Sequence, residues 1–385
     1  MMQSQIYSME VYRFYTLFLL FLLSACGRSQ NMDSVKHGLS AENLRLSAQL
    51  EDQGKEHIHM PALPTGYSSD RYINVPSGEI SALTKSKVVL IDIWDYTCVN
   101  CIRTLPYIKQ WADKYKDKGL VVVGVHSPEF EFEKQPKNLL SAINRLGLGY
   151  PIIADNEFEI WNSLANKYWP AKYLFDEHGI LRTTHFGEGE YQEFEAFLQK
   201  ILLERDSTLA LPPLDDLVRS TDKPGAVCYR PTPETYLGFS RNHPGNTEVT
   251  EPGKVVKFSL PKKLDEDRLY FEGSWQIERE FAQPSGDGMS KVLIDYQAKE
   301  VNLVIHPQGK SNFKVLIEQD GKPVNPDSRG TDLVEENGRT FIFVSEPRMY
   351  NLINNSKFGH FFLRLTSGDP ALGAFAFSFT SDCKE

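Results

Sequence analysis

The spacing of apolar residues divides the chain into an α/β part and an all-β part. Between about residues 80 and 204, apolar runs of strand length alternate with segments of helical period. The expected strands are 88–94, 120–126, 151–154, 172–175 and 180–186, and the expected helices are about 98–117, 137–147, 157–167 and 190–204. Strands that alternate with helices indicate an α/β domain with a largely parallel sheet.

The pattern changes after residue 206. Residues 206–226 gather proline, glycine and aspartate with little periodicity, which is typical of a linker. Beyond them, short β-rich runs recur with turn residues in between and no long helix, and this spacing is typical of an antiparallel β-sandwich. In the run Ala374–Phe379 every second residue is Phe. We expect these rings to share one face of the strand and to pack in the core of the sandwich.

The N-terminal residues follow neither pattern. Phe14–Leu23 are nearly continuously apolar, which is about half the length needed to span a bilayer and suits the core of a signal peptide. The segment ends in Leu23-Ser24-Ala25-Cys26, which resembles a bacterial lipobox, so we expect cleavage before Cys26 and a lipid on that cysteine. An ordinary signal peptide is the alternative. The polar residues 27–66 are expected to form a flexible tether.

Length and composition narrow the classes of function. A chain of 385 residues suits two domains and a leader, and 41% hydrophobic residues argue against extended disorder. A formal net charge of −9 argues against a nucleic-acid partner. The sequence contains no phosphate-binding glycine loop, no Ser-His-Asp arrangement with useful local context and no paired-carboxylate motif. The chemistry of the chain therefore rests on its cysteines.

Cys98 and Cys101 stand where the buried strand 88–94 gives way to a helix. The first thiol of such a helix faces free backbone N–H groups and the positive end of the helix dipole, which predicts a pKa lowered from about 8.5 to roughly 3.5–7.5. We therefore expect Cys98 to attack and Cys101 to resolve the mixed disulfide. Zinc would need two more ligands, and only His57 and His59 lie nearby, so no metal and no other cofactor is expected.

The residues around the thiols resemble the thioredoxin superfamily. Asp92 lies six positions before Cys98, and Pro106 lies five after Cys101. The string from Trp94 to Pro106 is similar to the TlpA/DipZ-type branch, as are the strings 124–129, 168–174 and 186–191. The resemblance covers residues 70–204 and, more loosely, the region after 228. It implies an α/β thioredoxin-like domain, with a central mixed sheet and flanking helices, followed by an all-β sandwich domain.

The same resemblance implies roles for four residues near the thiols. Asp92 would accept the proton of Cys101, although a buried Asp can instead merely bond a backbone group. Pro170 matches the cis-proline that faces the CxxC pair, and the backbone of Trp169 would then pair with a substrate strand. Trp94 would pack beside this substrate site, with a plain core position as the alternative.

Cys228 and Cys383 open and close the second domain. Because antiparallel sandwiches often bring their ends together, we expect a structural disulfide between them, with free buried thiols as the alternative. The predicted organisation is a lipoprotein signal peptide at 1–25, a tether at 26–66, a thioredoxin-like domain at 67–205, a linker at 206–226 and a β-sandwich domain at 227–385. By resemblance, the last domain is similar to carbohydrate-binding modules, which leaves a glycan ligand open.

Together these observations predict an exported thiol–disulfide oxidoreductase, a reductant or mild exchanger, tethered to the bacterial cell envelope by its lipid. Its partners would be exported proteins with disulfides or dithiols and a separate membrane protein that donates electrons. Gly27, after the lipidated cysteine, favours the periplasmic face of the outer membrane if the host is Gram-negative. The alternatives are a glycan- or protein-binding lipoprotein with a vestigial redox domain and, less favoured, a peroxide-reducing redoxin.

Overall fold

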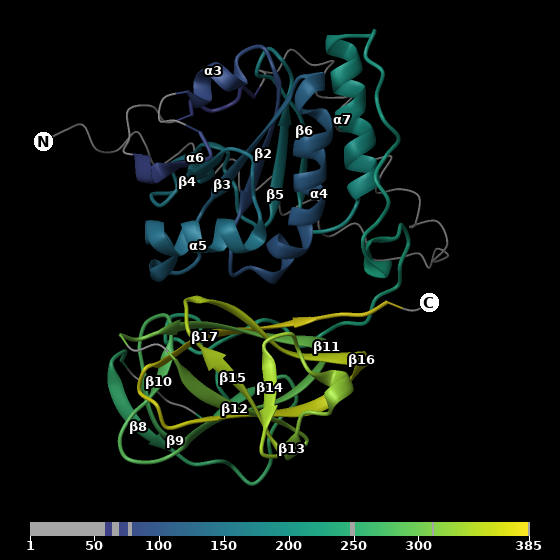
Figure 1. Cartoon of the computed structure of the whole chain (residues 1–385). Coiled ribbons are helices and arrows are strands. Elements are labelled where there is room, and N and C mark those ends of the chain that lie inside the picture. The colour runs from purple at the N-terminus through teal and green to yellow at the C-terminus, as the bar shows by residue number, and fades with distance from the viewer. Residues whose placement is uncertain (1–57, 64–68, 76–78, 247–250, 310–311, 384–385) are drawn as a thin grey trace, which may run out of the picture. The chain divides into compact units, whose positions relative to one another are not determined.

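The computed structural model describes residues 58–63, 69–75, 79–246, 251–309 and 312–383 (Figure 1). The predicted signal peptide, the predicted lipidation site Cys26 and most of the predicted tether lie outside these residues. Residues His57–Glu385 form one compact unit. In the described part of the chain, no helix is long and apolar enough to cross a membrane. The predicted domain boundaries remain predictions.

The first domain is built on a six-stranded sheet in the order β1-β4-β3-β2-β5-β6. The strands are β1 (Tyr72–Ile73), β2 (Val88–Trp94), β3 (Leu120–His126), β4 (Ile152–Ala154), β5 (Ala171–Phe175) and β6 (Leu181–Phe186). β2, β3 and β4 are parallel, whereas β1, β5 and β6 pair antiparallel with their neighbours. The mixed sheet implied by the resemblance is confirmed. The prediction of a largely parallel sheet is wrong. β5 and β6 form an antiparallel hairpin whose turn contains Gly179 at φ 76°.

Helices flank this sheet, as Figure 1 shows. They are α3 (Ile80–Thr84), α4 (Val99–Tyr115), α5 (Pro136–Leu146), α6 (Glu159–Ser163) and α7 (Tyr191–Arg205), with short 3-10 turns η1 (Ser69–Arg71), η2 (Lys116–Lys118) and η3 (Glu131–Lys134). The helix predicted at 157–167 is much shorter than expected. Phe158 at φ 57° and Ala165 at φ 49° adopt the left-handed conformation on either side of α6, and this conformation interrupts a right-handed helix.

Burial explains how β2 and α4 present the two thiols. Every residue of β2 is buried, so the strand lies in the interior of the domain. α4 buries Cys101, Leu105, Ile108 and Trp111, which recur every three or four residues on one face. This face turns Cys101 into the protein and leaves Cys98 at the beginning of the helix.

The C-terminal region is all β, as predicted. Its strands are β7 (Thr235–Tyr236), β8 (Lys254–Phe258), β9 (Leu269–Ile277), β10 (Ala282–Pro284), β11 (Ser290–Pro307), β12 (Phe313–Gln319), β13 (Lys322–Pro323), β14 (Leu333–Glu336), β15 (Arg339–Val344), β16 (Arg348–Ser367) and β17 (Leu372–Thr380). They form an 11-stranded antiparallel sheet whose buried side chains enclose one apolar core. Two 3-10 turns, η4 (Ser220–Asp222) and η5 (Pro326–Ser328), complete the described elements.

The three phenylalanines of β17 do not share one core. Phe377 and Phe379 join the apolar core of the C-terminal domain. The pairing of β17 with β11 shifts at Phe375, and an extra residue in one strand changes the face on which its side chain lies. The ring of Phe375 packs instead against Phe130 and Phe132 of the first domain, at centroid distances of 5.0 and 4.8 Å. The expectation for Phe375 was therefore wrong.

Candidate active site

The two thiols occupy different environments at the start of α4. Cys98 is the N-cap residue and is partly exposed, whereas Cys101 is buried. The backbone N–H of Cys101 donates to Cys98 Sγ at 3.2 Å. Both cysteines are free thiols. An incoming disulfide can therefore reach the sulfur of Cys98 but not that of Cys101.

The reactivity of Cys98 differs from the expectation. Burial raises the pKa of the Cys98 thiol and outweighs the lowering by hydrogen bonds from Cys101. The carboxylates of Asp95 and Glu129 raise this pKa further, because they oppose a second negative charge on the sulfur. Burial also raises the pKa of Cys101 well above its ordinary value. The predicted lowering of the Cys98 pKa is wrong in direction, because burial of the sulfur outweighs the hydrogen bonds that it accepts.

Asp92 lies inside β2 with no hydrogen-bond partner for either oxygen among the described residues. Burial raises its pKa to about 7, and the opposite charge of Lys172 lowers it only in part. Both Asp92 and Cys101 act electrostatically on Lys172 and on Tyr150, so these four groups lie close together behind the exposed thiol. Among the described residues, Asp92 therefore does not bond a backbone group, and its role as a proton acceptor remains a prediction.

Lys172 is a buried residue that the sequence analysis missed. It pairs in register with Asp92 across β2 and β5, and its Nζ donates to the carbonyl of Gly187 at 3.2 Å. Burial lowers its pKa to about 8. The sequence feature that could have revealed Lys172 is its charge inside the otherwise apolar run Ala171–Phe175. The identity of its partner depends on the register of the sheet, which that run does not specify.

The structure places the predicted substrate-side residues at different depths. The Trp169–Pro170 peptide bond is cis, and Trp169 is partly exposed. Trp94 is fully buried and meets the ring of His126 edge-on at 5.3 Å, so it packs in the core, as its alternative stated. Sequence reasoning also missed two exposed rings, Tyr168 and Phe186, whose centroids lie 5.7 Å apart.

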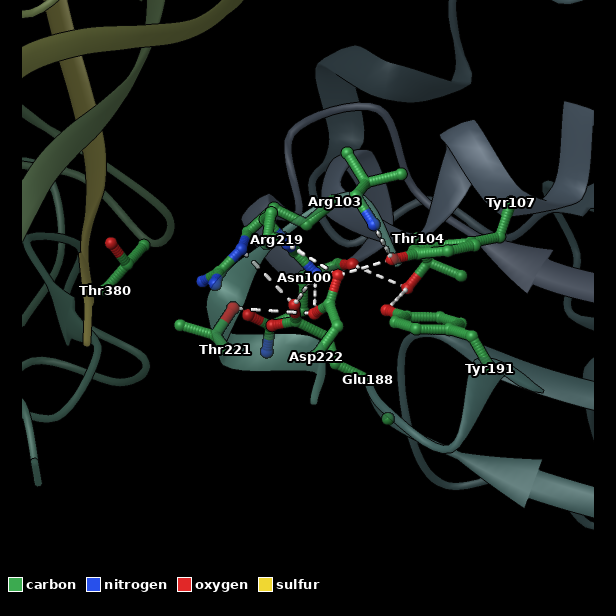
Figure 2. Close-up of polar contacts among 12 residues, drawn as sticks. Asn100, Arg103, Thr104, Tyr107, Glu188, Tyr191, Arg219, Thr221, Asp222 and Thr380 are labelled. Carbon is green, nitrogen blue, oxygen red and sulfur yellow. Dashed lines mark hydrogen bonds and ion pairs between the residues drawn. The ribbon is translucent and has the colours of Figure 1, made fainter. Parts of the chain in front are cut away.

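A network of charged and tyrosine side chains attaches the linker to α4 (Figure 2). Glu188 Oε2 pairs with Arg103 at 3.3 Å and with Arg219 at 2.9 Å. Arg219 also pairs with Asp222 at 2.8 Å, and Tyr107 donates its hydroxyl to Asp222 at 2.6 Å. The sequence analysis found no role for Glu188. In the structure it fixes the loop after β6 and the linker to the helix that carries the thiols.

Two further cysteines are bonded to each other. Cys228 and Cys383 form a disulfide that closes a loop of 155 residues and joins the two ends of the C-terminal domain. Within the described ranges, no three His, Cys, Asp or Glu side chains gather in a way that could hold a metal ion.

Replacing both Cys228 and Cys383 by Ser should lower the free energy of unfolding by about 2–5 kcal/mol, because the unfolded chain regains the entropy of an open loop. Denaturant titration of the oxidised protein measures this change. Exchange activity should stay the same, since neither cysteine belongs to the CxxC pair. Two alkylatable thiols at these positions in the denatured, oxidised wild type would contradict the bridge.

Two families match consecutive parts of the chain. Residues 77–198 match the Redoxin family, and residues 232–380 match the family described as thioredoxin like C-terminal domain. DipZ of Mycobacterium tuberculosis is 34% identical over 295 residues, which cover 74% of this chain and 40% of DipZ. The chain thus spans well under half the length of that relative.

Other relatives match a shorter part of the chain. The thiol-disulfide oxidoreductase YkuV of Bacillus subtilis is 30% identical over 132 residues, which cover 34% of this chain and 88% of YkuV. A solved thioredoxin-like protein in its oxidised form is 28% identical and covers 38% of this chain and 97% of its own, with a TM-score of 0.34. Because YkuV is 30% identical and is matched over 88% of its length, and residues 77–198 match the Redoxin family, the chain belongs to the thioredoxin superfamily of thiol–disulfide oxidoreductases.

Proposed function

We propose that this protein is an exported, membrane-tethered enzyme that reduces or exchanges disulfides of other exported proteins through Cys98 and Cys101. The observation that carries the proposal is the arrangement of the two sulfurs, one partly exposed at the N-cap of α4 and one buried. The outer thiolate forms a mixed disulfide with the substrate. The inner thiol then attacks Cys98, and this step releases the reduced substrate and leaves Cys98 and Cys101 oxidised.

The raised pKa of Cys98 supports a reducing direction. Strong oxidants of this superfamily have a very acidic first thiol, because a stable thiolate favours the reduced form of the enzyme. Burial and nearby carboxylates act in the opposite sense on Cys98. The reduced form is therefore less stabilised, so the enzyme passes electrons on more readily.

The proposed location rests on the N-terminal sequence. The lipobox-like string that ends at Cys26 supports lipidation, and residues 27–66 would give the enzyme reach from the membrane. If the host is Gram-negative, Gly27 next to the lipidated cysteine favours the periplasmic face of the outer membrane. A separate membrane protein would supply the electrons that return the CxxC pair to its reduced state. The proposal assigns no glycan ligand to the C-terminal domain.

Two measurements test the proposal. Equilibration with glutathione gives the reduction potential of the Cys98/Cys101 pair, which should lie nearer about −270 mV than about −120 mV if the enzyme is a reductant. Mass spectrometry of the membrane fraction should find an acylated Cys26 as the first residue. A reduction potential near about −120 mV would contradict the proposed reducing direction. An unmodified Cys26 would contradict the proposed lipid tether.

A further inference from the structure

Two buried carboxyl groups near the thiols have no role in the exchange described above. Asp95 belongs to the loop between β2 and α4, and Glu133 belongs to η3. Both are 0% exposed. Thr97 joins them: its backbone N–H donates to Asp95 Oδ1 at 2.7 Å, and its hydroxyl donates to Glu133. Two segments far apart in the sequence thus meet at Thr97, the residue that precedes Cys98.

The hydrogen bonds show which of the two carboxyl groups is ionised. Asp95 accepts two backbone N–H groups, from Thr97 at 2.7 Å and from Glu129 at 2.8 Å. The Thr97 hydroxyl also lies 3.3 Å from Asp95 Oδ1, so it bridges the two carboxyl groups. Two buried carboxylates held this close repel each other, so one of the two groups keeps a proton. Glu133 accepts one backbone N–H, from Phe130 at 2.7 Å, whereas Asp95 accepts two, so Asp95 is the better stabilised anion and Glu133 is the acid.

Burial makes this sharing of one proton the stable arrangement. Two adjacent carboxylates away from water would repel each other at a cost that protonation of one of them removes. Arg241 does not neutralise the pair, since it binds Glu129 instead. Accordingly, burial raises the pKa of Asp95 to about 6 and that of Glu133 well above its ordinary value.

We propose that Asp95 and Glu133 act as a proton-sharing positioning pair that controls how readily Cys98 becomes a thiolate. The proposal deepens the proposed function, because it rests on exchange at Cys98. The charge of Asp95 opposes ionisation of Cys98 and of Cys101. Neither carboxyl touches the substrate in this scheme. The pair acts by opposing the ionisation of the Cys98 sulfur. It therefore keeps the Cys98 thiol protonated until a substrate disulfide reaches it.

Other ionisable groups also face the pair and interact with it electrostatically. They are Tyr96, Cys98, Cys101, Glu129 and Glu234, with Arg145 acting on Tyr96 and Arg241 on Glu129. At neutral pH the pair carries one negative charge. When Glu133 loses its proton at higher pH, a second charge appears and suppresses the ionisation of Cys98 further. The reactivity of Cys98 should therefore rise with pH over a wider range than a single thiol would show.

Alkylation of the reduced full-length protein by iodoacetamide, followed on the Cys98 peptide by mass spectrometry, tests this pair. Asp95→Asn removes the charge and should raise the rate at pH 7 about threefold to tenfold, since one pKa unit changes the thiolate fraction about tenfold. Glu133→Gln keeps the size and polarity of the side chain but has no titrating proton. Its rate at pH 7 should stay within about twofold of wild type, and its pH profile should fit one titrating thiol.

Glu131→Gln is the matched control, because Glu131 is an exposed acid on the same turn that pairs with Lys134. It should behave like the wild type. The proposal is overturned if Asp95→Asn reacts no faster than this control, or if Glu133→Gln keeps the broad wild-type profile. If Asp95→Asn does not fold, the profile of Glu133→Gln decides alone. Alkylation needs no protein substrate, so a failure of disulfide exchange would leave this result standing.

Discussion

Cys98→Ala should abolish disulfide exchange, whereas Cys101→Ala should leave an enzyme that captures its partners and cannot release them. The sulfur of Cys98 is the one that a partner can reach, because Cys101 is buried. We expect the turnover of insulin disulfides to fall at least about a thousandfold in Cys98→Ala, since the nucleophile itself is lost. Non-reducing electrophoresis of Cys101→Ala should show covalent adducts that disappear on reduction.

The other cysteine pair provides the control for this experiment. A variant with both Cys228 and Cys383 replaced by Ser keeps the CxxC pair and should turn over normally without adducts. The adducts formed by Cys101→Ala in the native compartment would also identify the substrates. If Cys98→Ala accumulates adducts instead, the roles of the two thiols are reversed. If neither variant forms any, a binding protein with a vestigial redox domain becomes the better description.

Asp92→Asn should slow the release of the mixed disulfide about tenfold to a thousandfold and leave the attack by Cys98 nearly unchanged. Cys101 must lose its proton before its sulfur can attack, and Asp92 is the buried carboxyl that acts on the same neighbours as this thiol. Because burial raises the pKa of Asp92 to about 7, the base form is present above that pH. Release in the wild type should therefore accelerate as the pH rises through 7, whereas the variant should lack this step.

Lys172 gives an independent check on the same step. Its positive charge lowers the pKa of Asp92, so Lys172→Met should move the pH midpoint of release to a higher value. Asp113→Asn serves as the control, because Asp113 is an exposed acid on α4. Stopped-flow measurement of single-turnover release gives both rates and midpoints. An unchanged release rate in Asp92→Asn would exclude this residue as the proton acceptor.

Local residue patterns were enough to predict the features that depend on neighbouring residues. The alternation of apolar runs with helical segments predicted the α/β domain, and the short runs after residue 226 predicted an all-β domain, because side-chain periodicity is a local property. The position of Cys98 and Cys101 after an apolar run placed one thiol at the N-cap of α4 and the other on its buried face. These inferences needed no contact between distant segments.

Long-range packing controls which distant groups meet and therefore how the site behaves. Sheet register places Lys172 beside Asp92, and Thr97 joins Asp95 to Glu133 from another segment. Burial of the packed site, together with the carboxylates of Asp95 and Glu129, reverses the expected direction of the Cys98 pKa. In the same way, a bulge in β17 turned Phe375 away from the predicted core. Register, bulges and buried charge pairs follow from long-range packing, which local periodicity does not encode.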